Sequence, residues 1–178
     1  MEVATKQGQK GDESMSIADK IGQYLEEKDI SAGVLAEQLG YEKSTIIKIK
    51  NGKRRWQEEN DPALAAIDWR FAVAIAAERS GGYISNLLDL DPDIDIHPSA
   101  MKELVLKEIR DLERVLEATV VSRKTSLNRQ IEGERLWMEV KDVLDKAALK
   151  LGVIEEMYGL NRAELLEEYE EEVRRGER

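Results

Sequence analysis

The stretch from residue 32 to residue 51, AGVLAEQLGYEKSTIIKIKN, constrains the fold most, because two apolar repeats of helical period meet there at a single glycine. Ser31 can cap a first helix, and Gly40 can adopt the left-handed backbone of a sharp corner. A second helix is then expected from Lys43 to Asn51, ended by Gly52. A helix-turn-helix of this kind needs a small residue where its helices cross and apolar side chains that hold the second helix in place. The residues expected to do this are Leu35, Ala36, Leu39, Gly40, Tyr41, Ile46 and Ile49.

The other face of the helix expected over residues 43–51 carries mostly polar side chains. Helical spacing turns five residues away from the apolar contacts, namely Lys43, Ser44, Ile47, Lys48 and Asn51. Lysine and asparagine side chains can contact base edges or phosphates, and an exposed isoleucine can touch a thymine methyl group. This face is therefore a candidate to enter the major groove of DNA.

The net charge of −10 at first argues against nucleic acid, because phosphate binding needs a basic surface. The distribution of charge changes that conclusion. Between Tyr41 and Trp56, six basic residues stand against Glu42 alone, which gives this segment +5 and leaves −15 for the rest of the chain. The run from Lys53 to Arg55 can grip phosphates or simply solvate a loop, and its place beside a groove-binding helix favours the first interpretation. For Trp56, covering the core is favoured over base stacking.

The segment LGYEKSTIIKIKNGKRR closely resembles the lambda-repressor-like (Cro/Xre) family of helix-turn-helix regulators. The resemblance covers about residues 16–90, including Asn51-Gly52 and the later apolar positions Ala72, Ala76, Tyr83 and Leu87-Leu88. It implies a five-helix DNA-binding domain that recognises specific duplex sequences, commonly as a dimer. The DNA-contacting residues expected on this basis are Lys43, Ser44, Thr45, Ile47, Lys48, Asn51, Lys53, Arg54 and Arg55. Two departures stand out: Ala32-Gly33 replaces the family's frequent glutamine and polar partner, and Glu42 replaces its usual capping serine.

The remaining pattern predicts an all-α chain in four parts. Residues 1–15 are expected to form a flexible tail, residues 16–90 the DNA-binding domain, residues 91–98 an acidic linker, and residues 99–178 a long-helix hairpin or bundle. Within the first domain, helices are expected over about 16–28, 31–40, 43–51, 61–80 and 83–88. In the last part, one helix is expected around 101–116, a turn at 122–126, and a final acidic helix capped by Asn161.

An apolar repeat of seven residues runs along the C-terminal part. It alternates steps of three and four through Trp137, Val140, Leu144, Ala147, Leu151, Ile154 and Tyr158, a spacing that favours a seam between helices. Such a stripe can serve as intramolecular core or as a dimer seam, and both can hold. Self-association is favoured, because two long helices offer more apolar surface than a small domain can cover. The expected oligomer interface is Trp137, Val140, Leu144, Leu151 and Ile154.

Several kinds of site are not expected. The absence of cysteine excludes disulfides and thiolate metal ligands, and no apolar run has the length of a membrane span or signal peptide, so a cytoplasmic protein is expected. Alternating aspartates at 89, 91, 93 and 95 lack the glycine and glutamate of a calcium loop. His97, the single histidine, is expected to cap or turn the chain. We expect no catalytic residue, metal or cofactor, and hence no enzyme.

Taken together, these patterns predict a DNA-binding transcriptional regulator whose helix over residues 43–51 enters the major groove. The layout of a small repressor domain followed by helices that associate is similar to regulators of bacteriophages and other mobile elements. The main alternative is an adaptor, such as an antirepressor or antitoxin-like protein, that binds other proteins through its acidic helical region.

Overall fold

The computed structural model describes residues 15–119 and 126–178, and throughout these ranges every regular element is a helix. The all-α class predicted from the sequence is thereby confirmed. The elements are α1 (Ile17–Glu27), α2 (Ala32–Leu39), α3 (Lys43–Lys50), a 3₁₀ turn η1 (Glu58–Asn60), α4 (Asp61–Ile67), α5 (Trp69–Arg79), α6 (Leu87–Leu90), α7 (Pro98–Ala118), α8 (Ser126–Tyr158) and α9 (Arg162–Arg175). None of the described helices combines the length and the apolar character needed to cross a membrane.

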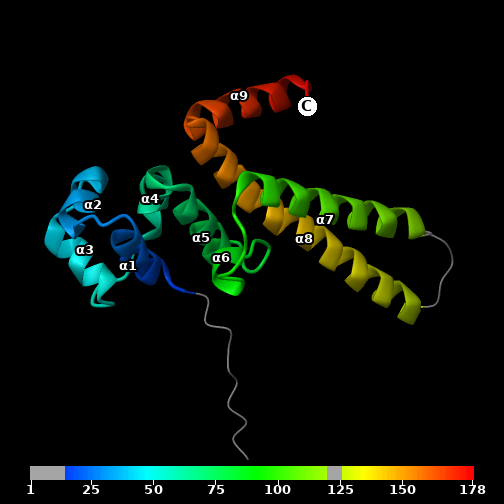
Figure 1. Ribbon diagram of the computed structural model, residues 1–178, viewed down its shortest axis with the longest axis horizontal. Coiled ribbons are helices and arrows are strands. Elements are labelled where there is room, and N and C mark those ends of the chain that lie inside the picture. Colours follow the sequence, from blue (N-terminus) through cyan, green and yellow to red (C-terminus); the bar gives the residue numbers. More distant parts are fainter. Residues whose placement is uncertain (1–14, 120–125) are drawn as a thin grey trace, which may run out of the picture.

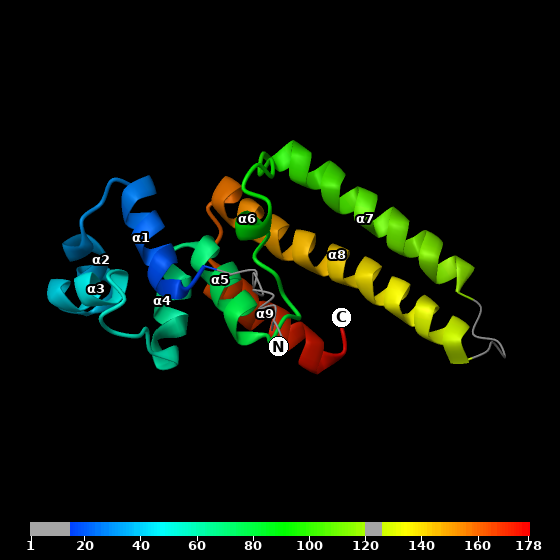
Figure 2. The same ribbon diagram turned by 90° about the horizontal axis from the view of Figure 1, so that it is seen from below.

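The helices form a short-helix unit and a long hairpin (Figures 1 and 2). Helices α1 to α6 cluster at one end, whereas α7 and α8 run antiparallel side by side and project away from that cluster. Helix α9 leaves the end of α8 that lies near the short helices. All but the last residue of the tail expected over residues 1–15, and most of the turn expected at 122–126, lie outside the described residues.

The first hydrophobic core holds the short helices together. Ile17, Ile21 and Leu25 recur on one face of α1 and lie 0–6% exposed against side chains from α2 to α5. Helix α1 begins where the sequence predicts, because Ser16 and Asp19 form a reciprocal capping box: the amide of Asp19 donates to Ser16 Oγ at 3.3 Å and the amide of Ser16 to Asp19 Oδ2 at 3.1 Å. Burial of each large apolar side chain contributes about 1.5 to 3 kcal/mol.

A second core joins the short helices to the hairpin. Trp69 and Val73 of α5 pack with Met101 of α7 and with Leu149 and Val153 of α8. The segment expected to be an acidic linker takes part as well, because Ile94 and Ile96 pack against this cluster. Contacts therefore cross the boundary that the aspartates and prolines suggested.

Gly152 lies where α5 crosses α8 and lets the helices approach closely. A Cβ atom at this position would lie 2.1 Å from Cε3 of Trp69, too close for any side chain. The junction is also polar: Asp145 accepts from the amide of Ser85 at 2.8 Å, and Lys141 donates to Ser85 Oγ at 2.6 Å. The short helices are thus docked on α8 by both packing and hydrogen bonds.

Two helix predictions in the first unit are wrong in detail. The helix expected over 61–80 is broken at Asp68, which has extended backbone (φ −152°, ψ 142°) and starts α5 by accepting from the amide of Arg70 at 2.9 Å. The helix expected over 83–88 forms only at Leu87–Leu90, because Ile84 instead donates its amide to Ser80 Oγ at 2.9 Å in the preceding turn.

Candidate nucleic-acid interface

Helices α2 and α3 meet through the corner predicted at Gly40, which has left-handed backbone (φ 69°, ψ 28°). The amide of Tyr41 donates to the carbonyl oxygen of Ala36 at 2.7 Å and closes the turn. Leu35 and Ala36 on α2 are at most 1% exposed. On α3, the two isoleucines of the expected scaffold are at most 2% exposed, while Leu39 and Tyr41 are half-buried against the same core. The first and last turns of α3 are thus anchored.

The opposite face of α3 is exposed. Lys43, Ser44, Ile47, Lys48 and Asn51 all lie at the surface, with Ile47 at 40% exposure. Each residue of an α-helix is turned by 100° from the one before it. Ile46 and Ile49 therefore lie on the side of α3 that faces the core, and the five exposed residues lie on the opposite side. Neither the hairpin nor α9 covers this face.

Thr45 does not belong with the expected DNA contacts. Its side chain is only 9% exposed, because position 45 lies on the same side of α3 as Ile49 and turns into the core. The expectation that Thr45 touches nucleic acid is therefore wrong, and its role is packing.

The basic loop after α3 is fixed next to the exposed face. Gly52 has left-handed backbone (φ 66°), and the amides of Lys53 and Arg54 both donate to the carbonyl oxygen of Lys48, at 2.8 and 3.1 Å. Lys53, Arg54 and Arg55 are all exposed. The loop is therefore held against the last turn of α3 instead of extending freely.

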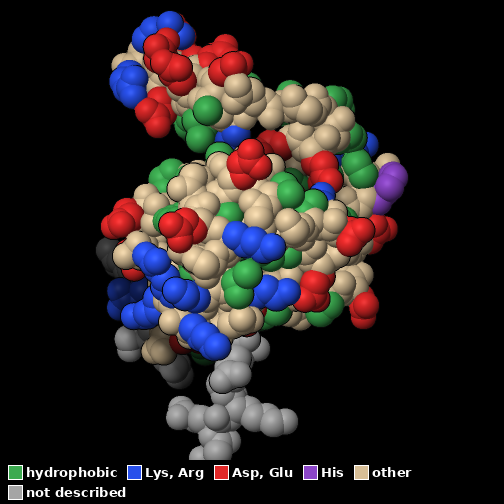
Figure 3. Space-filling view, turned by 90° about the vertical axis from the view of Figure 1, so that its left-hand side faces the viewer, with side chains coloured by type: hydrophobic (Ala, Val, Ile, Leu, Met, Phe, Trp, Pro, Cys, Tyr) green, Lys and Arg blue, Asp and Glu red, His purple; other side chains and the backbone are tan. Residues whose placement is uncertain are grey.

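The described acidic side chains form no ion pair with the cations on the outer face of α3 or in the basic loop. Across residues 15–119 and 126–178, we find no ion-pair partner for Lys43 or Lys48, nor for the three basic residues of the loop. Lys50, on the side of α3 next to α1, differs because it pairs with Glu26 at 3.1 Å. Figure 3, which views the molecule from the α2–α3 end, shows basic side chains gathered in the lower left part of this face.

Glu42, which stands where the family has a capping serine, does not cap α3 with its side chain. It occupies the N-cap of α3 but its side chain accepts no hydrogen bond from a backbone amide of the first turn. Instead Ser44 Oγ donates to Glu42 Oε2 at 3.3 Å. A carboxylate consequently stands at the start of α3, where a phosphate would otherwise meet free amides.

Other residues singled out in the sequence have structural roles. His97 caps α7, accepting at Nδ1 from the amide of Ser99 at 3.3 Å, as expected. Trp56 packs against the first core and donates from Nε1 to Asp61 Oδ1 at 2.8 Å, which agrees with a covering role. Among the described residues, no group of three or more histidine or acidic side chains is arranged to hold a metal ion.

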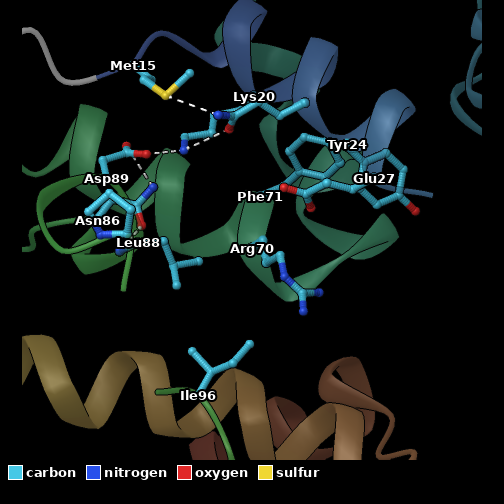
Figure 4. Close-up of a pocket in the computed structure, with 12 residues that line it drawn as sticks. Met15, Lys20, Tyr24, Glu27, Arg70, Phe71, Asn86, Leu88, Asp89 and Ile96 are labelled. Atoms are coloured by element: carbon cyan, nitrogen blue, oxygen red, sulfur yellow. Dashed lines mark hydrogen bonds and ion pairs between the residues drawn. The ribbon is translucent and has the colours of Figure 1, made fainter. Parts of the chain in front are cut away.

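A cavity of about 440 Å³, which sequence patterns did not indicate, lies between α1, α5 and the segment after α6 (Figure 4). Its polar side chains pair with one another: Lys20 bonds Asp89 and donates to Gln23 Oε1 at 3.1 Å, and Asn86 donates to Asp89 Oδ2 at 3.0 Å. Tyr24 and Phe71 line the same cavity, and burial raises the pKa of the Tyr24 hydroxyl, with the charge of Asp68 adding to the effect. These pairs tie α1 to α6.

Comparison of the chain with protein-family models, with curated proteins and with solved structures finds no match.

Proposed function

We propose that this protein is a transcriptional regulator of the phage-repressor type, in which α2 and α3 act as a helix-turn-helix and α3 enters the major groove of duplex DNA. The observation that carries the proposal is the two-sided character of α3. Its inner side chains are buried, which holds the helix rigid, while Lys43, Ser44, Ile47, Lys48 and Asn51 are exposed together on the outer side.

The outer face has suitable chemistry for contacting bases. Eight residues give α3 a length of about 12 Å, so the whole helix fits within a major groove about 12 Å wide. Lysine donates to guanine edges, asparagine pairs with adenine, and isoleucine packs on a thymine methyl group. Because these side chains sit on an anchored helix, their spacing is fixed before DNA binds, which favours specific contacts.

The basic loop supplies the electrostatic part of binding. Each cation that neutralises a phosphate releases condensed counterions and adds about 0.9 to the slope of log affinity against log salt. Lys53, Arg54 and Arg55, which pair with no acidic side chain among the described residues, lie beside α3, so they would contact the phosphates flanking the contacted bases. This local surface explains how a chain of net charge −10 would bind a polyanion.

Selection of bound fragments from random duplex DNA, followed by affinity measurement on the enriched sequence, tests the proposal. Lys48→Ala should weaken binding by about 1 to 3 kcal/mol if Lys48 contacts a base, and Arg54→Ala should lower the salt slope by about 1. Lys102→Ala is a matched control, because Lys102 is a 66% exposed lysine on α7, far from α3 along the chain. Unchanged affinity in both α3-region variants, or equal loss in the control, would rule out this surface as the DNA site.

A second candidate function is supported by α9. None of its 14 residues is buried, and Leu165, Leu166, Tyr169 and Val173 are 44–52% exposed on an otherwise acidic helix. An exposed amphipathic helix suits docking to another protein, as an antirepressor or antitoxin-like adaptor would do. A salt titration with random duplex DNA separates the two functions: binding that falls steeply with salt supports the regulator, and no binding at low salt supports the adaptor.

A further inference from the structure

Helix α8 is apolar on two opposite sides. One side packs inside the molecule, where Leu149 and Val153 are at most 5% exposed and Gly152 touches Trp69. The seven-residue repeat lies on the other side, because at 100° per residue its positions fall roughly opposite Leu149. A helix with apolar residues on both sides is typical of one that is covered on both sides.

The uncovered stripe is large. Trp137, Val140, Leu144 and Leu151 are 53%, 46%, 40% and 63% exposed, whereas Ile154, nearer the short helices, is half-buried. Most of the stripe expected to be a helix seam is therefore left uncovered by the described residues.

Helix α7 contributes to the same surface. Its inner side is marked by Glu108, which pairs with Lys146 of α8 at 3.4 Å, and by the buried Val115. Ile109 and Leu116, at 46% and 52% exposure, lie about a quarter turn from that inner side. On α8 the repeat likewise lies about a quarter turn from the side that meets α7. Because the two helices are antiparallel, both quarter turns lead to the same side of the hairpin.

We propose that this hairpin face, made by Ile109, Leu116, Trp137, Val140, Leu144 and Leu151, pairs with the same face of a second copy of the chain. The product is a homodimer held by a four-helix bundle of two α7–α8 hairpins. The face that each copy offers is the same, as a two-fold interface requires.

The exposed area comes close to what a stable dimer needs. At about 25 cal/mol per Å², the 1.5 to 3 kcal/mol gained by fully burying an aliphatic side chain corresponds to roughly 60 to 120 Å², and a fully buried tryptophan removes on the order of 150 to 250 Å² from water. Because about half of each of the six side chains is uncovered, the face offers on the order of 250 to 400 Å². A standard interface buries about 800 Å² per partner, of which about 57% is apolar, so it needs about 450 Å² of apolar surface. The hairpin face provides most of this amount without any other part of the molecule.

The charges flanking the repeat also permit two identical copies to meet. Lys141 is bonded to Asp145 and Ser85, Lys150 donates to the carbonyl oxygen of Pro98 at 2.9 Å, and Glu155 pairs with Arg162 at 2.6 Å. These groups are already neutralised within one molecule, so copies of a chain with net charge −10 would not be held apart at the seam.

Sedimentation equilibrium of the full chain without DNA tests the dimer independently of DNA binding. The wild type should have twice the mass of one chain, and Leu144→Glu should weaken self-association at least about 100-fold, because a two-fold seam would bury the new carboxylate twice. Met138→Glu is the matched control and should stay dimeric, since Met138 is 60% exposed on α8 but lies on the side of Asp145 and Gly152. Circular dichroism should show equal helix content in all three proteins.

The outcomes divide clearly. A wild type that stays monomeric across the micromolar range, or a Leu144→Glu protein that remains dimeric, overturns the proposal. Loss of the dimer in Leu166→Glu but not in Leu144→Glu also overturns it, since that result would assign self-association to α9. If the proposed function also holds, the dimer implies that the bound DNA has two half-sites. This implication rests on the proposed function, and a dimer that binds no DNA would refute that function while leaving the dimer intact.

Discussion

The short helices and the C-terminal helices differ in how much of their apolar surface is buried. Among the side chains that the structure describes, the large apolar ones that are substantially exposed number four in residues 15–97 and fifteen in residues 98–119 and 129–178. One of the four, Ile47, belongs to the outer face of α3. The short helices bury most of their apolar residues in the first core and expose a group of cations around α3, whereas the C-terminal helices leave apolar stripes exposed. This contrast teaches that the first region buries most of its apolar surface within the chain, in part against the hairpin, and that the second gains its full burial only when something covers it.

The largest effect should come from emptying the first core. Leu35→Ala removes a side chain with 0% exposure and should lower the free energy of unfolding by about 2 to 5 kcal/mol, since the cavity adds to the lost burial. The neighbouring Val34→Ala should cost under about 0.5 kcal/mol, because Val34 is 44% exposed. Urea unfolding followed by circular dichroism measures both. Similar losses in the two variants would contradict the division into a packed inner side and an open outer side.

The next effect concerns the junction between the regions. Gly152→Ala places a Cβ 2.1 Å from the ring of Trp69 and should destabilise the protein by about 1 to 3 kcal/mol. Gly133→Ala, in the same helix with no atom within 4 Å of its Cβ, should instead stabilise it by up to about 1 kcal/mol, because alanine favours helix. Thermal unfolding of both variants distinguishes a close crossing from a general intolerance of α8 to alanine. If Gly152→Ala were neutral, the two regions would not be packed as tightly as their shared core implies.

The same contrast explains how far sequence alone reaches. Helices α1 to α3 were predicted to within a residue or two, because Ser16, Ser31 and Gly40 carry signals in the local chain. The break at Asp68 is not predicted, because the apolar repeat continues across it. An aspartate is nevertheless a common N-cap residue, and Asp68 does cap α5 by accepting from the amide of Arg70.

For the candidate site and the hairpin, the limits are physical as well. Spacing identified most of the outer face of α3, but it could not show that Thr45 turns inward or that Glu42 leaves its amides uncapped. The seven-residue repeat on α8 can be recognised in the sequence. The sequence alone does not show that α8 has a second apolar side, the one that packs inside the molecule. That side is defined by contact with Trp69 and Val73, about 80 residues away in the chain.

The smallest expected effect is on stability, and it comes from the ion pair between Glu156 of α8 and Arg70 of α5 at the junction of the two regions. Glu156 accepts from Trp69 Nε1 at 2.8 Å and pairs with Arg70 at 3.2 Å; the tryptophan hydrogen bond first, and then the cations Arg70 and Lys28, lower the pKa of the Glu156 carboxyl. A carboxyl whose pKa is lower in the folded state stabilises the fold above its unfolded pKa of about 4.3, and that contribution is lost as pH falls through the folded pKa.

Glu156→Gln keeps an acceptor for Trp69 but removes the charge, so it should reduce the stability at pH 7 by about 0.5 kcal/mol or less, because the side chain is 51% exposed. The difference from wild type should shrink as pH falls below about 4.3 and vanish once the wild-type carboxyl is protonated. Glu167→Gln, an exposed position on α9, serves as the control and should show no such pH dependence. Urea unfolding from pH 7 to pH 3 gives the comparison. A constant difference between Glu156→Gln and wild type across that range would mean that packing of Trp69 on Gly152, without the ionic contact, holds the short helices on the hairpin.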